Sequence, residues 1–235
     1  MAQQEFPSLV PPKRERLPDA IASQIKTLIF SNNLAEGQKL PSERELAVQL
    51  GVSRVVVRDA LRSLELSGLI EIRPGSLGGA YVAYNLYKPF LNSIYDLFRE
   101  GKLTLHHFYE VREAIERSSI GRAVTRVSEE DIRRLERINR KLIDDIEDKT
   151  KLREHNLAFH LAIADISGNP LIKMMVQSLI ELLNTLYPES RQSSEYIRDT
   201  YRRHEAIIGA LRERNAEQCQ KTMAIDTEHT KKLVV

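Results

Sequence analysis

Apolar residues near the start of the chain recur at the spacing of helices. Over residues 17–31 they return every three to four positions, which predicts a first helix, and the turn-forming residues up to Gly37 end it. Ser42 followed by Glu45 is a capping box, in which the serine oxygen accepts from the third amide and the glutamate reaches back. A second helix is therefore predicted over residues 43–50.

A third helix and a hairpin follow directly. Gly51 suits the left-handed conformation that ends a helix, and Ser53 is placed to cap a helix that runs to about Ser67. Apolar residues then surround a glycine-rich turn and predict two short strands: Leu69, Ile70, Ile72, Tyr81 and Val82 around Gly75, Gly78 and Gly79. The pattern predicts a helix-turn-helix with a β wing.

The pattern changes after Ala83, and from Pro89 onwards it contains amphipathic helices without a convincing strand. Six or seven helices are expected, roughly over residues 89–100, 104–126, 128–148, 151–167, 170–187, 193–214 and 215–232. The predicted fold is mainly α: a winged helix-turn-helix followed by an all-α antiparallel helical bundle. The expected segments are a flexible N-terminal arm (1–16), the winged domain (17–83), a linker (84–88) and the bundle (89–235).

Composition narrows the class of protein. The chain has 235 residues, of which 42% are hydrophobic and 29% charged, as in an ordinary globular protein. The net charge is only +2, so any attraction to nucleic acid must come from a local basic surface. Cys219 is the single cysteine, which excludes an internal disulfide and suits a reducing cytoplasm, and no apolar run is long enough for a membrane span.

The third predicted helix carries such a basic surface. Arg54, Arg58 and Arg62 are spaced four residues apart and so share one face, while the opposite face is apolar. A helix of this kind can lie in the major groove, where arginine pairs with guanine. The alternative is a solvated basic face on an ordinary surface helix.

Two stretches of the chain resemble a known family. LPSERELAVQLGVSRVVVRDALRSLELSGLI, at residues 40–70, with the glycine-tipped wing after it, resembles the DNA-binding half of the GntR family of bacterial transcription regulators. EVREAIE (110–116), FHLAIADISGNP (159–170) and HEAIIGAL (204–211) resemble the FadR-type C-terminal (FCD) domain of its FadR subfamily. The resemblance implies a cytoplasmic homodimer that binds a palindromic operator in double-stranded DNA. It also implies a small-molecule effector, often a carboxylate, in the helical domain, and a repressor is the favoured form.

The resemblance also implies which residues contact the operator. They lie at the start of the second and third helices and on the wing: Arg44, Ser53, Arg54, Val56, Arg58 and Gly75. Physical reasoning agrees in part, since Arg54 and Arg58 at the N-terminal end of the recognition helix would reach base edges. Arg44 is better suited to a phosphate.

In many relatives the helical domain holds a divalent metal through an aspartate, a histidine four residues later, and two later histidines. The matching positions here are Asn156, His160, His204 and Asp226, so two match and two do not. Two imidazoles, a carboxylate and an amide oxygen can form a site for Zn, Ni or Mn. The same four residues are expected to contact the effector. The alternative is that the histidines are buried and hydrogen-bonded, with Asp226 as an ion-pair partner and no metal.

Arg112 is a further candidate for binding the effector. It lies in EVREAIE among apolar positions that predict partial burial, and a buried guanidinium needs a partner. Glu116, four residues later, is one candidate, and the carboxylate of a ligand is the other. The two are compatible, because Glu116 can hold Arg112 until an anion arrives.

The sequence can be interpreted as one of three classes of function. A ligand-responsive transcription regulator accounts for both halves of the chain and for their order. A metal-dependent enzyme is disfavoured, because no nucleophile and base pair and no complete set of metal ligands is evident in the sequence. A constitutive DNA-binding protein, whose helical half only dimerises, would not be stabilised by any small acid.

Overall fold

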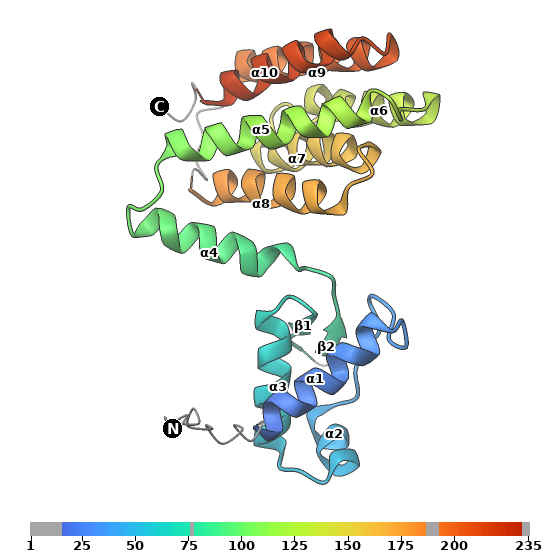
Figure 1. Cartoon of the computed structure of the whole chain (residues 1–235), viewed down its shortest axis with the longest axis vertical. Helices are drawn as coiled ribbons and strands as arrows, with labels where there is room; N and C mark the ends of the chain where they lie inside the picture. The colour runs from blue at the N-terminus through green and yellow to red at the C-terminus, as the bar shows by residue number, and fades with distance from the viewer. Residues whose placement is uncertain (1–15, 76–77, 187–192, 232–235) are drawn as a thin grey trace, which may run out of the picture. The chain divides into compact units, whose positions relative to one another are not determined.

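A computed structural model describes residues 16–75, 78–186 and 193–231, apart from the side chains of residues 149 and 150 (Figure 1). The predicted N-terminal arm therefore lies outside the described residues, except for Arg16. The chain splits into two compact units between Leu86 and Tyr87. Each unit is described by itself.

The first unit contains three helices and a hairpin. Its elements are α1 (Leu17–Phe30), α2 (Glu43–Leu50), α3 (Arg54–Leu66), β1 (Ile70–Arg73) and β2 (Gly79–Val82). The strands are antiparallel, with Ile70 opposite Val82 and Arg73 opposite Gly79. The three helices pack on the hairpin around one apolar core that includes Ile29, Val57, Leu64 and Leu69.

Local signals explain where these helices begin and end. Ser42 and Glu45 form the predicted capping box at the start of α2, and Gly51 ends that helix in the left-handed conformation, at φ 64°. The Ser53 hydroxyl accepts from the amide of Val56 at the start of α3. The helix-turn-helix is confirmed, with both helices capped as the sequence predicts.

The hairpin has a third partner that the sequence pattern did not reveal. The amide of Leu40 donates to the carbonyl of Ala80, and the amide of Val82 donates to the carbonyl of Gln38. Lys39 lies opposite Tyr81 in this short antiparallel bridge. The segment before α2 therefore pairs with the edge of β2 that β1 leaves open.

The second unit is built from helices only, among the residues that the structure describes. They are α4 (Tyr87–Arg99), α5 (Leu105–Ala123), α6 (Glu129–Asp144), α7 (Lys149–Ile166), α8 (Pro170–Leu186), α9 (Ser194–Arg212) and α10 (Ala216–Lys231). Contacts join α5 to α7, α8 and α10, and α9 to α6 and α10, while α4 packs on α8 (Figure 1). The predicted mainly α fold, a winged helix-turn-helix followed by a helical bundle, is confirmed.

Some helix ends differ from the predicted ones. Helix α4 starts at Tyr87, inside the predicted linker. The prediction placed Pro89 at the first helical position, but proline is tolerated throughout the first turn, and Pro89 lies two residues after the start. Helix α5 ends at Ala123, although the buried Val124 and Val127 continue the apolar pattern. Apolar spacing does not separate a helix from the buried turn that follows it.

The core of the bundle surrounds α7. Phe159, Ala162 and Ile163 of that helix are fully buried and pack with residues of α5, α6, α9 and α10. Within the described part of the chain, no helix is both long enough and apolar enough to cross a membrane.

Candidate DNA-binding and effector sites

Helix α3 separates an apolar face from a basic one. Val57, Ala60, Leu61 and Leu64 are buried in the core of the first unit. Arg54, Arg58 and Arg62 are exposed, as their spacing predicts. The basic face of α3 therefore lies outside the apolar core of the unit.

Glu43, in the first turn of α2, binds Arg58 of α3 and lies near Arg54. Its carboxylate accepts from Arg58 Nε at 3.1 Å and from Arg58 Nη2 at 2.9 Å. Arg54 Nη2 lies 3.8 Å from the same carboxylate. The hydrogen bond from Arg58 lowers the pKa of Glu43 below its ordinary value. Sequence reasoning missed Glu43, although it is the first residue of α2.

The other expected DNA contacts differ in their surroundings. Arg44 is exposed on α2, and Gly75 is exposed beyond β1 with φ 100°. The Ser53 hydroxyl is used as the cap of α3, at 3.4 Å from the amide of Val56, and Val56 packs partly against the core. Arg44, Arg54 and Arg58 thus offer exposed cationic groups, whereas Ser53 and Val56 also have structural roles.

The second site is a buried cluster at the centre of the bundle. It joins Arg112 and Glu116 of α5, His160 of α7, His204 of α9 and Asp226 of α10, and each of these residues is at most 2% exposed. One ligand atom from each of His160, His204 and Asp226 lies within 4.8 Å of the others. Four helices therefore bring together residues that are up to 114 positions apart, from Arg112 to Asp226.

Each histidine has a hydrogen-bond partner at Nδ1. His160 Nδ1 lies 3.0 Å from Glu116 Oε2, and His204 Nδ1 lies 3.1 Å from the side-chain oxygen of Asn139. The Nε2 atoms of His160 and His204 are buried and have no hydrogen-bond partner among the described residues. His160 Nε2 lies 3.4 Å from Asp226 Oδ2. The Nε2 atom of His160 therefore faces the carboxylate of Asp226, whereas that of His204 is unpartnered among the described residues.

The two histidines differ in charge. Burial alone disfavours the imidazolium of His160, but the neighbouring carboxylates of Glu116 and Asp226 raise its pKa to about 9. Burial lowers the pKa of His204 to about 3. Burial also opposes ionisation of Glu116 and Asp226, yet the adjacent His160 holds the pKa of each carboxyl below its ordinary value. At neutral pH the cluster thus contains ionised carboxylates, a protonated His160 and a neutral His204.

Arg112 is fully buried rather than partly buried as predicted. Its Nε lies 3.4 Å from Glu116 Oε1, so the expected pair is present. Its Nη1 and Nη2 atoms are buried and have no hydrogen-bond partner in the described part of the chain. A buried guanidinium left half unsatisfied is costly, and its paired Nη donors match a carboxylate.

Asp226 has a partner that sequence reasoning missed. Arg203, on α9, donates from Nε to Asp226 Oδ1 at 2.9 Å and from Nη2 to the hydroxyl of Thr200. This leaves Asp226 Oδ2 facing His160. Asn156, the remaining residue of the expected set, is half-buried on α7, one turn before His160.

The donor atoms fit a divalent metal. Two imidazole nitrogens and one carboxylate oxygen are ligands that Zn²⁺ and related ions accept, and three protein ligands leave a position open for another molecule. The lone pair of His204 Nε2 is available in the neutral imidazole, whereas that of His160 Nε2 would become available when an ion displaces its proton. The hydrogen bonds from Nδ1 to Glu116 and Asn139 are the kind of outer contacts that orient metal-binding histidines. His160, His204 and Asp226 could therefore bind a metal.

Comparison with known proteins matches the two units to two families. Residues 17–82 match the bacterial regulatory proteins of the gntR family, and residues 107–228 match the FCD domain. The putative L-lactate dehydrogenase operon regulatory protein of Escherichia coli K12 is 29% identical over 220 residues, which cover 88% of this chain and 82% of that protein. The transcriptional repressor NanR of Cronobacter sakazakii is 27% identical, over 91% of this chain and 83% of the repressor.

Solved structures share the fold. A GntR protein of Streptococcus agalactiae superposes with a TM-score of 0.68 at 23% identity, over 92% of this chain and 99% of that one. McbR/YncC of Escherichia coli gives a TM-score of 0.52 at 20% identity, over 92% of this chain and 96% of that one.

Proposed function

Because this chain belongs to the GntR family of bacterial transcription regulators and has an FCD effector-binding domain behind its DNA-binding domain, we propose that it is a repressor released by a small carboxylate. The effector binds in the buried cluster of the helical bundle. The observation that carries this proposal is the buried Arg112, whose two Nη atoms have no partner among the described residues. Two relatives are also named as a lactate dehydrogenase operon regulator and a repressor.

On the DNA side, α3 is the recognition helix. Arg54 and Arg58 contact base edges in the major groove, Arg44 contacts a phosphate, and Ser53, Val56 and the wing at Gly75 complete the interface. The operator is a palindrome, because a homodimer presents two such helices related by a two-fold axis. The exposure of the three arginines supports this assignment.

On the effector side, Arg112 binds the carboxylate through both Nη atoms. His160, His204 and Asp226 lie beside it and hold a divalent ion, Zn²⁺, Ni²⁺ or Mn²⁺, with Asn156 as a further ligand. A bound ion of this kind supplies positive charge and an open coordination position for an oxygen of the effector. The chain's own contribution is to exclude water and to orient the acid.

The effector acts on the operator through the equilibrium between two states. A ligand changes DNA affinity only if it binds the DNA-competent and incompetent states differently. The connection between the units is short, since β2 ends at Val82 and α4 starts at Tyr87. When the acid binds and orders the bundle, this short connection transmits the change to the DNA-binding unit.

A thermal-shift screen of small organic acids, with and without added Zn²⁺, Ni²⁺ or Mn²⁺, tests the effector assignment. An effector present at about a hundred times its dissociation constant is expected to raise the melting temperature by about 5 °C or more. An amide of the same acid is the control and should have no effect. If no acid stabilises the protein, the helical bundle serves only for dimerisation and the effector proposal is wrong.

Selection of bound sequences from a random DNA duplex library tests the DNA assignment. The selected sequences should contain an inverted repeat, and the stabilising acid should release the protein from them. Selection of no common sequence contradicts the operator proposal, whatever the acid screen shows.

A further inference from the structure

His204 is held on the side away from the buried cluster by Asn139 of α6. The side-chain oxygen of Asn139 lies 3.1 Å from His204 Nδ1, and both residues are fully buried. The ring of His204 is also stacked on Phe159, with centroids 3.7 Å apart and planes 5° from parallel. Stacking on Phe159 therefore fixes the plane of the imidazole, and the contact with Asn139 fixes its rotation within that plane.

The orientation of the Asn139 amide follows from its other two contacts. Its Nδ2 donates to the main-chain oxygen of Tyr201 at 3.2 Å and to Glu205 Oε1 at 2.7 Å. A carbonyl oxygen and a carboxylate oxygen only accept hydrogen bonds. The reversed amide would place its own oxygen against these two oxygens, so Asn139 Oδ1 must face His204.

An accepting oxygen at Nδ1 determines where the proton of His204 lies. A neutral imidazole carries one N–H, and Nδ1 must bear it in order to donate to Asn139. The lone pair is then on Nε2, the atom left without a hydrogen-bond partner among the described residues.

We infer that Asn139, itself held by Glu205, is a positioning residue of the effector site: it fixes His204 as the Nδ1–H tautomer and presents Nε2 to the cluster as a ligand atom. The tautomer of His204 is determined by its contact with Asn139 and requires no metal. The binding of a metal by His204 Nε2 rests on the proposed function.

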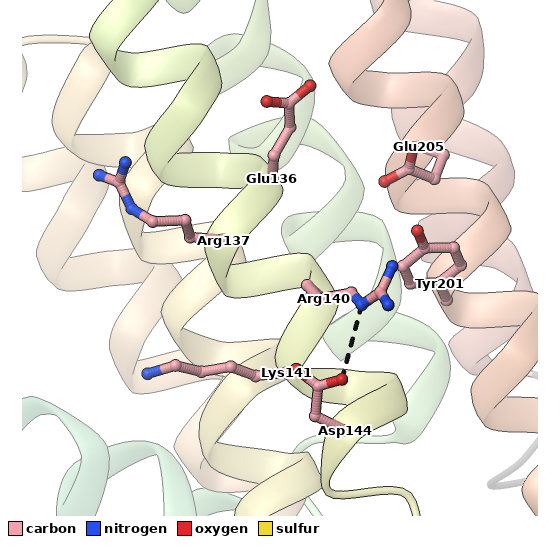
Figure 2. A pocket seen from close by; sticks show the side chains of 7 residues that line it. All are labelled: Glu136, Arg137, Arg140, Lys141, Asp144, Tyr201 and Glu205. Carbon is pink, nitrogen blue, oxygen red and sulfur yellow. Dashed lines mark ion pairs between the residues drawn. The ribbon is translucent and has the colours of Figure 1, made fainter.

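Glu205 connects this buried arrangement to the surface. It is exposed on α9 and lines an open pocket of about 590 Å³ between α6 and α9, together with Tyr201 and Arg140 (Figure 2). The chain of contacts from Glu205 through Asn139 to His204 thus runs from a surface pocket to the buried cluster. Because Glu205 is exposed, it can be replaced without opening a cavity in the core.

The tautomer is measured first, on metal-free protein labelled with ¹⁵N at histidine. Long-range ¹H–¹⁵N correlation spectra of the wild type should show His204 protonated at Nδ1. Asn139→Leu, or Asn139→Ala if the leucine variant does not fold, should lose this preference. Thr222→Val is the matched control, since Thr222 is a buried polar residue whose hydroxyl donates to the main-chain oxygens of Gln218 and Cys219. A wild-type His204 protonated at Nε2 overturns the inference.

The binding of Zn²⁺ is measured second, by competition with a chromophoric chelator. Loss of an outer contact to a metal-binding histidine typically weakens the metal about 10- to 100-fold, and this is expected for the Asn139 variant. Glu205→Gln still offers an accepting oxygen and should retain affinity, whereas Glu205→Ala should lose part of it. If both Glu205 variants lose the same Zn²⁺ affinity, the negative charge of Glu205 matters rather than its hydrogen bond to Asn139. That result would overturn the role given to this hydrogen bond.

The two experiments separate the inference from the proposed function. The wild type could bind no Zn²⁺ and still show the Nδ1–H tautomer, with the tautomer lost in the Asn139 variant. That outcome would remove the metal from the proposed function and leave the role of Asn139 intact. Unchanged tautomer and unchanged Zn²⁺ affinity in a folded Asn139 variant overturn the inference and leave the metal in place.

Discussion

Arg58 of α3 donates two hydrogen bonds to the carboxylate of Glu43 on α2. The two contacts, from Nε and Nη2, are 3.1 and 2.9 Å long to separate carboxylate oxygens. An exposed ion pair of this kind adds little to the stability of the fold. Its two parallel hydrogen bonds nevertheless limit the directions in which the guanidinium of Arg58 can point. The same glutamate lies near Arg54, the other arginine proposed to read bases.

Replacing Arg58 by alanine is expected to remove specific DNA binding. A bidentate contact between arginine and guanine contributes about 1–3 kcal/mol of base discrimination, so affinity for a selected operator should fall about ten- to hundredfold or more. Titration of a labelled operator duplex measures the change. Arg62→Ala, one turn further along α3, is the matched control and should have a smaller effect. Unchanged binding by a folded Arg58→Ala protein would remove α3 from its proposed role.

Replacing Glu43 by glutamine is expected to weaken specificity rather than binding itself. The variant loses a negative charge beside the basic face and no longer holds Arg58 as an ion pair. Affinity for a random duplex should rise, with a steeper dependence on salt, while the ratio of operator to random affinity falls. Titrations of both duplexes at several salt concentrations measure the ratio. A ratio equal to that of the wild type would mean that Glu43 does not orient Arg58 on DNA.

Replacing Arg112 by lysine should abolish the response to a carboxylate effector. Lysine keeps the positive charge but lacks the pair of Nη donors, and a hydrogen bond to a charged group contributes about 1.5–3 kcal/mol. The dissociation constant of a stabilising acid should rise roughly tenfold or more by calorimetry. Arg117→Lys serves as the control, because Arg117 is exposed on the same helix and pairs with Glu113. Equal affinities in the wild type and the Arg112 variant would place the acid elsewhere.

The start of α6 gives a pH-dependent prediction. Asp131 accepts from the hydroxyl and amide of Ser128, and these hydrogen bonds hold the pKa of Asp131 below its ordinary value of 3.8. The folded state therefore favours the carboxylate, and this stability is present above about pH 4 and is lost as the pH falls through the lowered pKa. Asp131→Asn should lower the free energy of unfolding by up to about 1 kcal/mol at neutral pH.

Urea unfolding at neutral and acidic pH measures this difference. Glu129→Gln is the control, since it removes an exposed first-turn charge from the same helix without removing the capping box. The Asp131 variant and the wild type should converge in acid. A difference that grows as the pH falls would contradict the assigned sign.

Cys219 should be unreactive in the folded protein. It is fully buried, and burial raises the pKa of its thiol to about 11. At about pH 8 roughly a thousandth of the thiol would be ionised even if it were accessible, and the thiolate is the reactive form. Alkylation followed by mass spectrometry should therefore show labelling only after unfolding in urea. Rapid labelling of the native protein would place Cys219 outside the core.

The DNA-binding unit could be predicted closely because its signals are local. The capping box of Ser42 and Glu45 and the left-handed Gly51 act within four residues of the helix ends that they determine. The pairing of residues 38–40 with β2 could not be predicted this way, because it joins segments about forty positions apart and leaves no periodicity in so short a run.

The proposed effector site could be predicted only in part. His160, His204 and Asp226 were found through a family resemblance, and the structure brings them together. Arg203 and Asn139 were missed because their partners lie 23 and 65 positions away. One signal for Asn139 is present in the sequence, since it occupies a core position of α6 alongside Ile132, Leu135 and Leu142. A polar residue at an otherwise apolar position usually has a buried partner.

The buried cluster places the bundle under a trade-off between stability and activity. Ion pairs of this kind are often no better for folding than apolar residues of similar volume, and removal of one partner is destabilising. Replacement of Arg112, Glu116, His160 and Asp226 together by well-packed apolar residues should therefore give a more heat-resistant protein that no longer responds to its effector. A buried group of four charged residues is costly to keep for folding alone, and the proposed response to an effector gives it a use.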